Sequence, residues 1–353
     1  MMSKRYKYWI FPFAVAGIFW LITSSCERSF EEKDPFKVIS LGSLSDDIPY
    51  DELGSGKILF FRNDLSDSSG CYVIDIDQKS SYGFRLNSDI RMPYISPDGS
   101  KIACSLYDSP VPNPAWNIYC MDIDGSNCFP VSSSYEIFPT WTPDGLKILC
   151  YKHQVDGALY VLSATENSTD RVELVRFYYE DDPDWYFEPS GGFSMSPDGE
   201  LVCASFAGSE ISGILKIEPY LGKSGVSILL PKADYDMPLG SVFSPDGTKI
   251  AMAIAEGDSL FGQQTIWIKS MDPDGTNLTP LAGIKNTTVL ISYWNAYPLI
   301  SLCWSPDSKK ILFNAPNEQG DGFHLMCVNA DGSGLIQVTD RPGVNDLSVS
   351  WGR

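Results

Sequence analysis

The stretch MPYISPDGSKIACSL, Met92 to Leu106, decides the fold because close variants of it return four more times along the chain. The other copies read FPTWTPDGLKILCY, GFSMSPDGELVCAS, GSVFSPDGTKIAMA and SLCWSPDSKKILFN. Their last turn residues are 46, 54, 48 and 61 residues apart, at Gly99, Gly145, Gly199, Gly247 and Ser308. A fixed phrase with variable spacing indicates one repeated supersecondary unit whose loops differ in length.

The Ser/Thr-Pro-Asp-Gly segment of each copy has the composition of a tight turn. Proline presets φ for the second position, and glycine takes the left-handed conformation that closes a hairpin. We expect the first hydroxyl to bond its own backbone two residues on. Ser308 replaces the glycine in the last copy, which should cost a little stability. Each turn therefore predicts two antiparallel strands.

The strand after each turn is apolar on both faces, as a strand sandwiched between neighbouring sheets would be. One face carries Ile102 and Cys104 in the first copy, and the residues between them are apolar too. A third strand follows in IYCMDIDG, IWIKSMDPDG and LMCVNADG, and a weaker fourth strand comes after the Asp-Gly turn. Four short strands in a unit of roughly 40–50 residues are typical of propeller blades.

Two incomplete units flank the five full ones. Near the start, GKILFFRND, CYVIDID and FRLN match the second, third and fourth strands, and at the end LSVSWGR matches an inner strand. We therefore predict an all-β, six-bladed β-propeller over residues 56–353. Its ring is closed by the C-terminal strand, which joins the first blade and leaves no open sheet edge between the ends.

The phrase W-S-P-D-G-x-K-I followed by I-Y-x-M-D-x-D-G resembles the TolB-like propeller repeats of bacterial envelope proteins. The resemblance covers residues 56–353 and recurs five times. TolB itself has an α/β domain before its propeller, whereas only about 30 residues, Glu27 to Ser55, precede the repeats here. The resemblance therefore implies the fold rather than membership of the Tol–Pal system.

The first residues read as an export signal. Lys4, Arg5 and Lys7 precede an apolar run that ends in Thr-Ser-Ser-Cys, and small residues before a cysteine resemble a bacterial lipobox. We interpret residues 1–25 as a lipoprotein signal peptide, Cys26 as the lipidated residue and 26–55 as an acidic tether. The alternative is an ordinary signal peptide or an uncleaved anchor helix.

The acidic residues after Cys26 resemble the export signal of surface lipoproteins in the Bacteroides group. We therefore expect an outer-membrane lipoprotein, on the periplasmic or the cell-surface side, that touches the membrane through its lipid anchor only. Without residues 1–25 the chain has 23 Lys and Arg against 45 Asp and Glu, a net charge of −22. Such a surface repels phosphate backbones, which argues against nucleic acid and leaves an envelope protein or a glycan as partner.

The cysteines and histidines do not have the spacing of a metal site. No C-x-x-C occurs, and His153 and His324 are the two histidines. We expect the eight cysteines after Cys26 to be free and buried, with a Cys104–Cys120 disulfide as the alternative. The Asp-x-Asp-Gly motifs are expected to be hairpin turns because they lack the distal ligand of a calcium loop. No cofactor is predicted, although a cation held by acids in the channel, with no residue assigned, remains an alternative.

The long aromatic and acidic loops should gather on one face of the propeller, opposite the short turns. Such loops, held by a rigid scaffold, are where binding residues usually lie. Aromatic rings beside carboxylates suit sugars or peptides, although each ring could instead pack inward. The predicted ligand-binding residues are Trp116, Tyr135, Tyr179, Trp185, Tyr186, Tyr235, Trp294 and Tyr297.

Catalytic motifs are scarce in the sequence. No G-x-S-x-G nucleophile elbow occurs, and two histidines are few for a metal-dependent lyase. We therefore predict a non-enzymatic module that binds a protein or a glycan. The alternative is a carbohydrate-active enzyme, a glycoside hydrolase or lyase, that uses loop-face carboxylates such as Glu180 and Asp184.

Overall fold

The computed structural model describes residues 34–64, 68–107, 116–132, 136–152, 157–176, 189–207, 212–218, 225–231, 237–257, 264–287, 300–316 and 322–353. In these residues, one short helix, α1 (Tyr50–Leu53), accompanies twenty-five strands, β1 (Ile39–Gly42) to β25 (Asn345–Gly352). The described ranges contain no helix that is long and apolar enough to cross a membrane.

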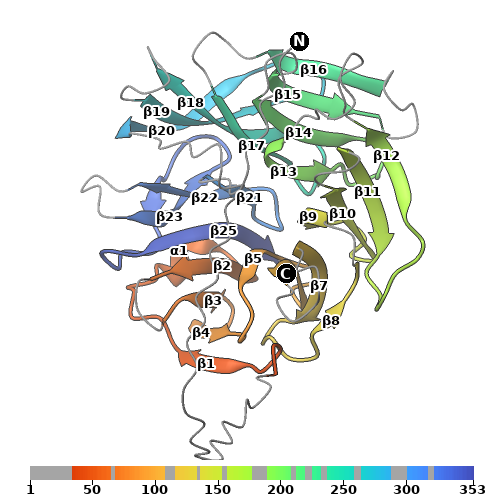
Figure 1. Cartoon of the computed structure of the whole chain (residues 1–353). Helices are drawn as coiled ribbons and strands as arrows, with labels where there is room; N and C mark the ends of the chain where they lie inside the picture. Colours follow the sequence, from red (N-terminus) through yellow and green to blue (C-terminus); the bar gives the residue numbers. More distant parts are fainter. Residues whose placement is uncertain are drawn as a thin grey trace, which may run out of the picture. The chain divides into compact units, whose positions relative to one another are not determined.

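Four antiparallel four-stranded sheets follow one another along the chain, each with its strands paired in sequence order. The first two contain β5 (Ile90–Ile95), β6 (Lys101–Tyr107), β7 (Trp116–Asp122), β8 (Phe129–Pro130), β9 (Glu136–Trp141), β10 (Lys147–Lys152), β11 (Ala158–Ser163) and β12 (Val172–Arg176). The next two contain β13 (Pro189–Met195), β14 (Val202–Ala207), β15 (Ser212–Ile217), β16 (Val226–Pro231), β17 (Met237–Phe243), β18 (Ile250–Gly257), β19 (Gln264–Met271) and β20 (Thr279–Thr287). Figure 1 shows these sheets arranged as blades around a common centre, which confirms the predicted all-β propeller arrangement.

The fifth sheet has nine strands and contains both the early and the late parts of the chain. Its order is β1-β4-β3-β2-β25-β23-β22-β21, with β24 beside β23. Its remaining strands are β2 (Lys57–Asn63), β3 (Gly70–Asp75), β4 (Ser80–Arg85), β21 (Leu302–Trp304), β22 (Lys310–Pro316), β23 (Phe323–Asn329) and β24 (Ile336–Gln337). The predicted pairing of the C-terminal strand with the first unit is present, because β25 runs antiparallel to β2 along its length.

The five repeated turns have the expected backbone. The φ angle is 73°, 70°, 76° and 72° at Gly99, Gly145, Gly199 and Gly247, and 60° at Ser308. The expected role of the first hydroxyl is wrong, because Ser96 Oγ donates to Asp98 Oδ1 at 2.6 Å instead of bonding the backbone two residues on. It is Asp98 Oδ1 that accepts from the backbone two residues on, from Ser100 N at 3.0 Å. A carboxylate held this way rigidifies the turn.

The sheets pack face to face through the strands that follow the turns. Ile102 and Cys104 on β6 belong to one apolar cluster with β3 of the neighbouring sheet, whereas Ala103 packs with Ile148 on β10 of the other neighbour. Both faces of β6 are therefore buried, as the sequence predicts. Burying apolar side chains on both faces of each sheet supplies the main stabilisation of the fold.

The eight cysteines after Cys26 are all free. The Cys104–Cys120 disulfide is contradicted, because Cys104 pairs with Tyr119 and Cys120 with Ala103, so the two side chains point to opposite faces of the sheet. Burial raises the pKa of the Cys120 thiol to about 12, which keeps it protonated at neutral pH. Six of the eight thiols are buried, as predicted, and act as small apolar groups of the core, whereas Cys128 and Cys303 are half-buried.

The Asp-x-Asp-Gly motifs form hairpin turns, as predicted. Gly125 N donates to Asp122 O at 2.9 Å. The Asp122 carboxylate accepts from Lys101 Nζ at 2.9 Å and from Asn127 Nδ2 at 2.6 Å. The corresponding carboxylate at Asp272 has the equivalent lysine and asparagine partners. These oxygens hold their own turn together.

Residues 34–55, which the sequence assigns to the tether, pack against the sheets. β1 pairs antiparallel with β4 at the outer edge of the nine-stranded sheet. The Phe36 ring lies 5.6 Å from that of Tyr119, and Leu53 of α1 is 1% exposed. The segment therefore adds a strand, a short helix and apolar contacts to the fold.

A buried ion cluster joins this segment to both ends of the repeat region. Arg62 on β2, 1% exposed, donates to Asp46 at 2.8 and 3.0 Å and to Asp346 on β25 at 2.6 and 2.8 Å. Asp346 also accepts from Thr339 Oγ1 at 2.6 Å, and Asp46 accepts from two backbone amides at residues 340 and 341. Burial opposes ionisation of Asp46, but the bonds from Arg62 and these amides outweigh it and lower the pKa of the carboxyl.

Removing Arg62 should destabilise the fold strongly, because Asp46 and Asp346 would be left buried without a counter-charge. We expect Arg62→Ala to lower the free energy of unfolding by about 3–5 kcal/mol, measured by urea denaturation. Arg176→Ala is the matched control, because its ion pair with Glu173 is largely exposed and worth about 0–1 kcal/mol. Equal losses in the two variants would contradict a structural role for the cluster.

Candidate functional site

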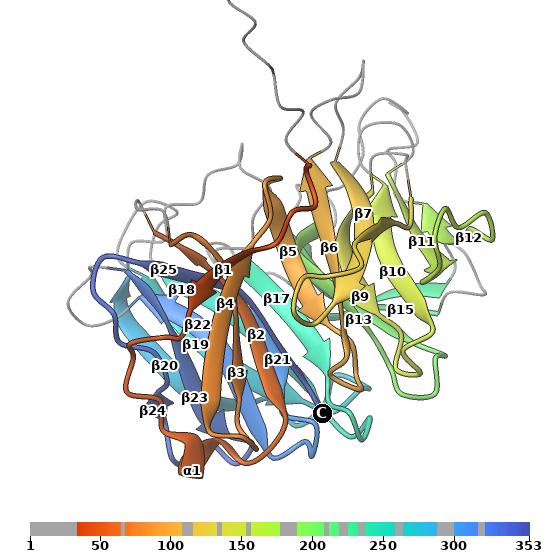
Figure 2. The ribbon, with the colours of Figure 1, turned by 90° about the horizontal axis from the view of Figure 1, so that it is seen from below.

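A cavity of about 730 Å³ lies at the centre of the propeller, at the end where the Ser-Pro-Asp-Gly turns gather. Residues of β5, β9, β13, β17, β21 and β25, or just before them, line it together with turn prolines such as Pro97 and Pro143. The side view in Figure 2 shows the C-terminus at this same end of the strands. The volume falls within the roughly 300–1,000 Å³ of small-molecule sites.

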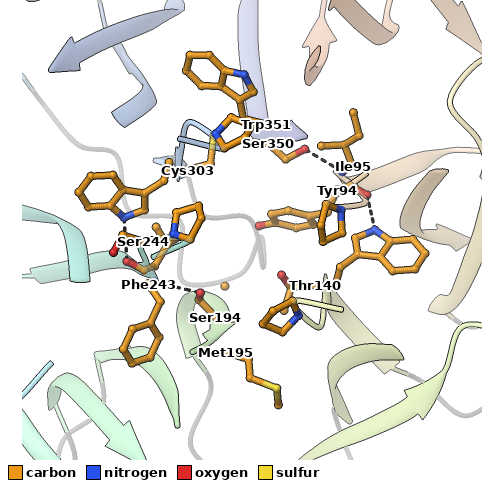
Figure 3. A pocket seen from close by; sticks show the side chains of 18 of the residues that line it. Tyr94, Ile95, Thr140, Ser194, Met195, Phe243, Ser244, Cys303, Ser350 and Trp351 are labelled. Carbon is orange, nitrogen blue, oxygen red and sulfur yellow. Dashed lines mark hydrogen bonds between the residues drawn. The ribbon is translucent and has the colours of Figure 1, made fainter. Parts of the chain in front are cut away.

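The pleat of the inner strands decides which side chains reach this cavity. Each inner strand leads into a turn, and its residues are numbered here backwards from that turn. The residue at the second position before the turn, such as Tyr94 before Ser96, is partly exposed in most strands and lines the cavity. The first position is mostly large and buried, as at Trp141, Phe243, Trp304 and Trp351. Figure 3 shows the second-position residues, among them Tyr94, Thr140, Ser194, Cys303 and Ser350, around the space.

Hydrogen bonds between neighbouring sheets hold the cavity wall. Trp141 Nε1 donates to the main-chain carbonyl of Tyr94 at 3.0 Å, and Trp304 Nε1 donates to that of Val242 at 3.3 Å. In two other junctions a cavity hydroxyl accepts from the next sheet. Ser350 Oγ accepts from Ile95 N and Ser194 Oγ from Phe243 N, each at 3.0 Å (Figure 3). The wall is thus fixed before any ligand arrives.

The Tyr94 side chain points into the cavity (Figure 3). A Cβ added at Gly192 on β13 would lie 3.2 Å from the Tyr94 hydroxyl, so this side chain extends from β5 past β9. Glycine at 192 therefore leaves room for the ring. Burial raises the pKa of Tyr94 to about 12, so the phenol is neutral at physiological pH and can donate a hydrogen bond.

The turn aspartates around the cavity are ionised at neutral pH. Hydrogen bonds from Ser96 and Thr142 hydroxyls lower the pKa of Asp98 and of Asp144, respectively, and both carboxylates line the cavity. Arg353 is the other charged residue in the lining. At the three remaining turns the aspartate pKa is also lowered. Burial is the largest single effect at Asp246 and Asp307 and opposes ionisation there, but the hydrogen bonds from the turn hydroxyl and the backbone together outweigh it. The turn end therefore carries five ionised carboxylates, one at each repeated turn.

Most of the predicted ligand-binding residues lie outside the described ranges, as does the predicted lipidation site Cys26. The residues in question are Tyr135, Tyr179, Trp185, Tyr186, Tyr235, Trp294 and Tyr297. Trp116 is described and half-buried, at the start of β7, opposite Tyr107 and thus at the far end of its sheet from the cavity. The Arg91 guanidinium lies 4.5 Å from its ring centroid and the Tyr107 ring 5.2 Å away.

A metal centre is not formed by the part of the chain that the structure describes. In those ranges, no group of three or more His, Cys, Asp or Glu side chains is placed to hold an ion. His324 is fully buried on β23, and His153 lies outside the described ranges. For the predicted alternative of a cation in the channel, the described ranges therefore offer no residues that can be assigned as its ligands.

The cavity residues are not among the predicted binding residues, although the sequence carries a signal for them. The second residue before each turn is Tyr94, Thr140, Ser194, Val242 or Cys303, and Ser350 takes this place in β25. Four of these six residues carry a hydroxyl, whereas the neighbouring position is large and apolar. Period-two alternation alone does not say which face meets the channel, so the pattern by itself does not indicate a site.

Comparison with protein-family models finds no match, and comparison with curated proteins also finds none. Among solved structures, TolB of Acinetobacter baumannii is similar at 17% identity and a TM-score of 0.61, over 84% of this chain and 66% of that chain. A candidate TolB of Agrobacterium tumefaciens is similar at 15% identity and a TM-score of 0.50, over 85% of this chain and 100% of that one.

An oligogalacturonate lyase of Vibrio parahaemolyticus is also similar, at 10% identity and a TM-score of 0.46, over 82% of this chain and 75% of that chain. That likeness is too slight to carry an argument about activity. The match to the Acinetobacter protein spans slightly less than two thirds of its length. Together with the topology, the two TolB likenesses show the fold of this chain, a TolB-like β-propeller.

Proposed function

We propose that this protein is a lipid-anchored β-propeller of the bacterial outer membrane that binds a protein or a glycan without catalysing a reaction. The observation that carries the binding function is the central cavity, whose wall is fixed by hydrogen bonds between sheets. Preformed concave sites with a few placed polar groups are where ligands usually bind. The lipobox-like sequence before Cys26 supports the anchor.

The cavity also supports the six-bladed ring. We propose that the nine-stranded sheet is two blades, β21–β24 and β25-β2-β3-β4, with β1 added at the outer edge of the second. The two halves are joined by one parallel bridge, Phe323 to Asn345, whereas every other pairing in the sheet is antiparallel. The last residues also dock on the next blade, since Arg353 N donates to Pro97 O at 3.1 Å.

If β25 closes the ring, deleting residues 345–353 should abolish cooperative thermal unfolding. A milder test uses Gly99, where a Cβ would lie 1.9 Å from the backbone oxygen of Arg353. Gly145 has nearly the same φ, 70° against 73°, but an added Cβ there would meet nothing nearer than 3.7 Å, so Gly145→Ser should cost only the left-handed strain of about 1–2 kcal/mol. Gly99→Ser should cost clearly more by urea denaturation. A deletion variant that melts like the wild type would disprove closure.

The anchor predicts that Cys26 is the acylated residue. Cells grown with radiolabelled palmitate should label the wild-type protein and not the Cys26→Ser variant, whose protein should leave the membrane fraction. Cys128→Ser is the matched control, because Cys128 is a half-buried core cysteine, and it should keep the label. Label retained in Cys26→Ser would refute acylation at Cys26. In a separate experiment, protease treatment of intact cells would show on which side of the membrane the wild-type protein lies.

The binding function predicts an occupant of the cavity in cells. A photoreactive benzoylphenylalanine at Thr140 should form a light-dependent adduct with a protein or a glycoconjugate. The same residue at Ile228, exposed on the outer strand β16, is the control and should form none. Equal adducts at the two positions, or none at Thr140, would count against a binding site in the cavity.

The enzymatic alternative gains no support from the described residues. The loop acids on which it depends, Glu180 and Asp184 among them, lie outside the described ranges. The cavity acids Asp98 and Asp144 each accept hydrogen bonds within their own turn, which fits a structural role. Product analysis after incubation with polysaccharides would reveal new chain ends if the protein were a hydrolase or a lyase.

A further inference from the structure

The second-position residues give the cavity a side with hydroxyls, here called the polar side, and a side without them, where Ser241, Ser244 and Ser301 of other positions also belong to the lining. On four neighbouring inner strands, β25, β5, β9 and β13, the second residue before the turn carries a hydroxyl, whereas β17 and β21 carry an aliphatic side chain and a thiol. Figure 3 shows this order around the space for the labelled members. The residues concerned are Ser350, Tyr94, Thr140, Ser194, Val242 and Cys303. Burial raises the pKa of the Cys303 thiol well above its usual value, so this group stays neutral.

The hydroxyls on the polar side have hydrogen-bonding capacity left for a ligand. Neither the Tyr94 hydroxyl nor Thr140 Oγ1 bonds any residue in the described ranges, and each can donate and accept. Ser194 Oγ and Ser350 Oγ each accept one backbone N–H, which leaves their own protons free to donate. Four donors along one arc can satisfy several hydroxyl groups of one ligand.

The wall itself is uncharged. Asp98, Asp144 and Arg353 are the charged residues of the lining, and all three lie at the turns or the C-terminus. Moving a charged ligand out of water into a wall without a counter-charge is unfavourable. The ionised turn aspartates add repulsion for an anion at the entrance. The wall therefore disfavours uronates, phosphates and other anions, and Arg353 is the single positive charge of the lining, at the C-terminus.

A pyranose has the matching chemistry, because its hydroxyls lie around the ring edge and its C–H groups form apolar faces. The Tyr94 ring can pack on such a face while the surrounding hydroxyls bond the edge. A peptide segment would present backbone groups that need partners on both sides, and the side formed by Val242 and Cys303 offers an aliphatic group and a neutral thiol. Shape and polarity thus favour a sugar.

We propose that the turn-end cavity binds a neutral saccharide, with Tyr94 and Thr140 as its principal hydrogen-bonding contacts. The proposal rests on the binding function proposed above and names the ligand class for it. It places the ligand at the turn end of the propeller rather than on the loop face that the sequence favours.

Calorimetric titration of the full-length lipidated protein tests this, in a detergent whose headgroup contains no sugar. The probes are neutral trisaccharides of glucose, galactose, mannose and N-acetylglucosamine, with trigalacturonate as the charged counterpart of galactotriose. We expect at least one neutral probe to bind and trigalacturonate to give no heat. Tyr94→Phe and Thr140→Val should each weaken binding about threefold to tenfold, the loss expected for one hydrogen bond.

The matched control is Tyr82→Phe, because Tyr82 on β4 has a pKa raised to about 12 by burial, as Tyr94 does, and does not line the cavity. It should bind the neutral probe as the wild type does. Circular dichroism melts of all three variants show whether each is folded. If one cavity variant does not fold, the other still decides the outcome.

Three outcomes would overturn the saccharide proposal. The first is that no neutral probe binds, and the second is that trigalacturonate binds as well as galactotriose. The third is that binding is lost in Trp185→Ala and Trp294→Ala but kept in Tyr94→Phe and Thr140→Val. If the photoreactive residue at Thr140 then captures a protein in cells, the cavity is a protein site and the proposed binding function stands. If it captures nothing and no probe binds, both proposals fail together.

Discussion

The pleat of the inner strands is the constraint on which the rest of this structure depends. Successive side chains of a strand point to opposite faces, so one residue before each turn enters the neighbouring sheet and the next faces the centre. Trp141 shows both effects, since its ring is buried between sheets and its indole N–H bonds the carbonyl of Tyr94. The same geometry that builds the core therefore also builds the cavity, and a change in strand register would destroy both.

A radial arrangement of sheets needs its first and last parts held together, and here charge contributes as well as strand pairing. β25 pairs with β2, and Arg62 lies between Asp46 and Asp346, which are separated from it by 16 and 284 residues. A buried cluster of this kind adds little net stability compared with apolar packing, but it tolerates no loss of one partner. It therefore specifies which segments meet, while the apolar faces supply most of the energy.

The proposed function follows from what this scaffold presents rather than from its fold, since one fold supports many functions. The wall of the cavity is rigid, neutral and hydroxylated along one arc, whereas its entrance is acidic. Such a surface can bind and orient a ligand, and in the described ranges no group of three or more His, Cys, Asp or Glu side chains is placed to hold a metal ion. We therefore propose binding as the role of this surface.

The sequence by itself determined the repeat, the turns, the strand order and the pairing of the two ends, because these depend on local chemistry and period-two patterns. Gly99 and its equivalents adopt the left-handed conformation that the turn requires. Only the tertiary structure decided that Ser96 bonds Asp98, that Arg62 meets Asp346 and that Tyr94 faces the centre. Those facts depend on how sheets distant in sequence are placed in space, and the alternation along an inner strand does not by itself say which of its two faces meets the channel.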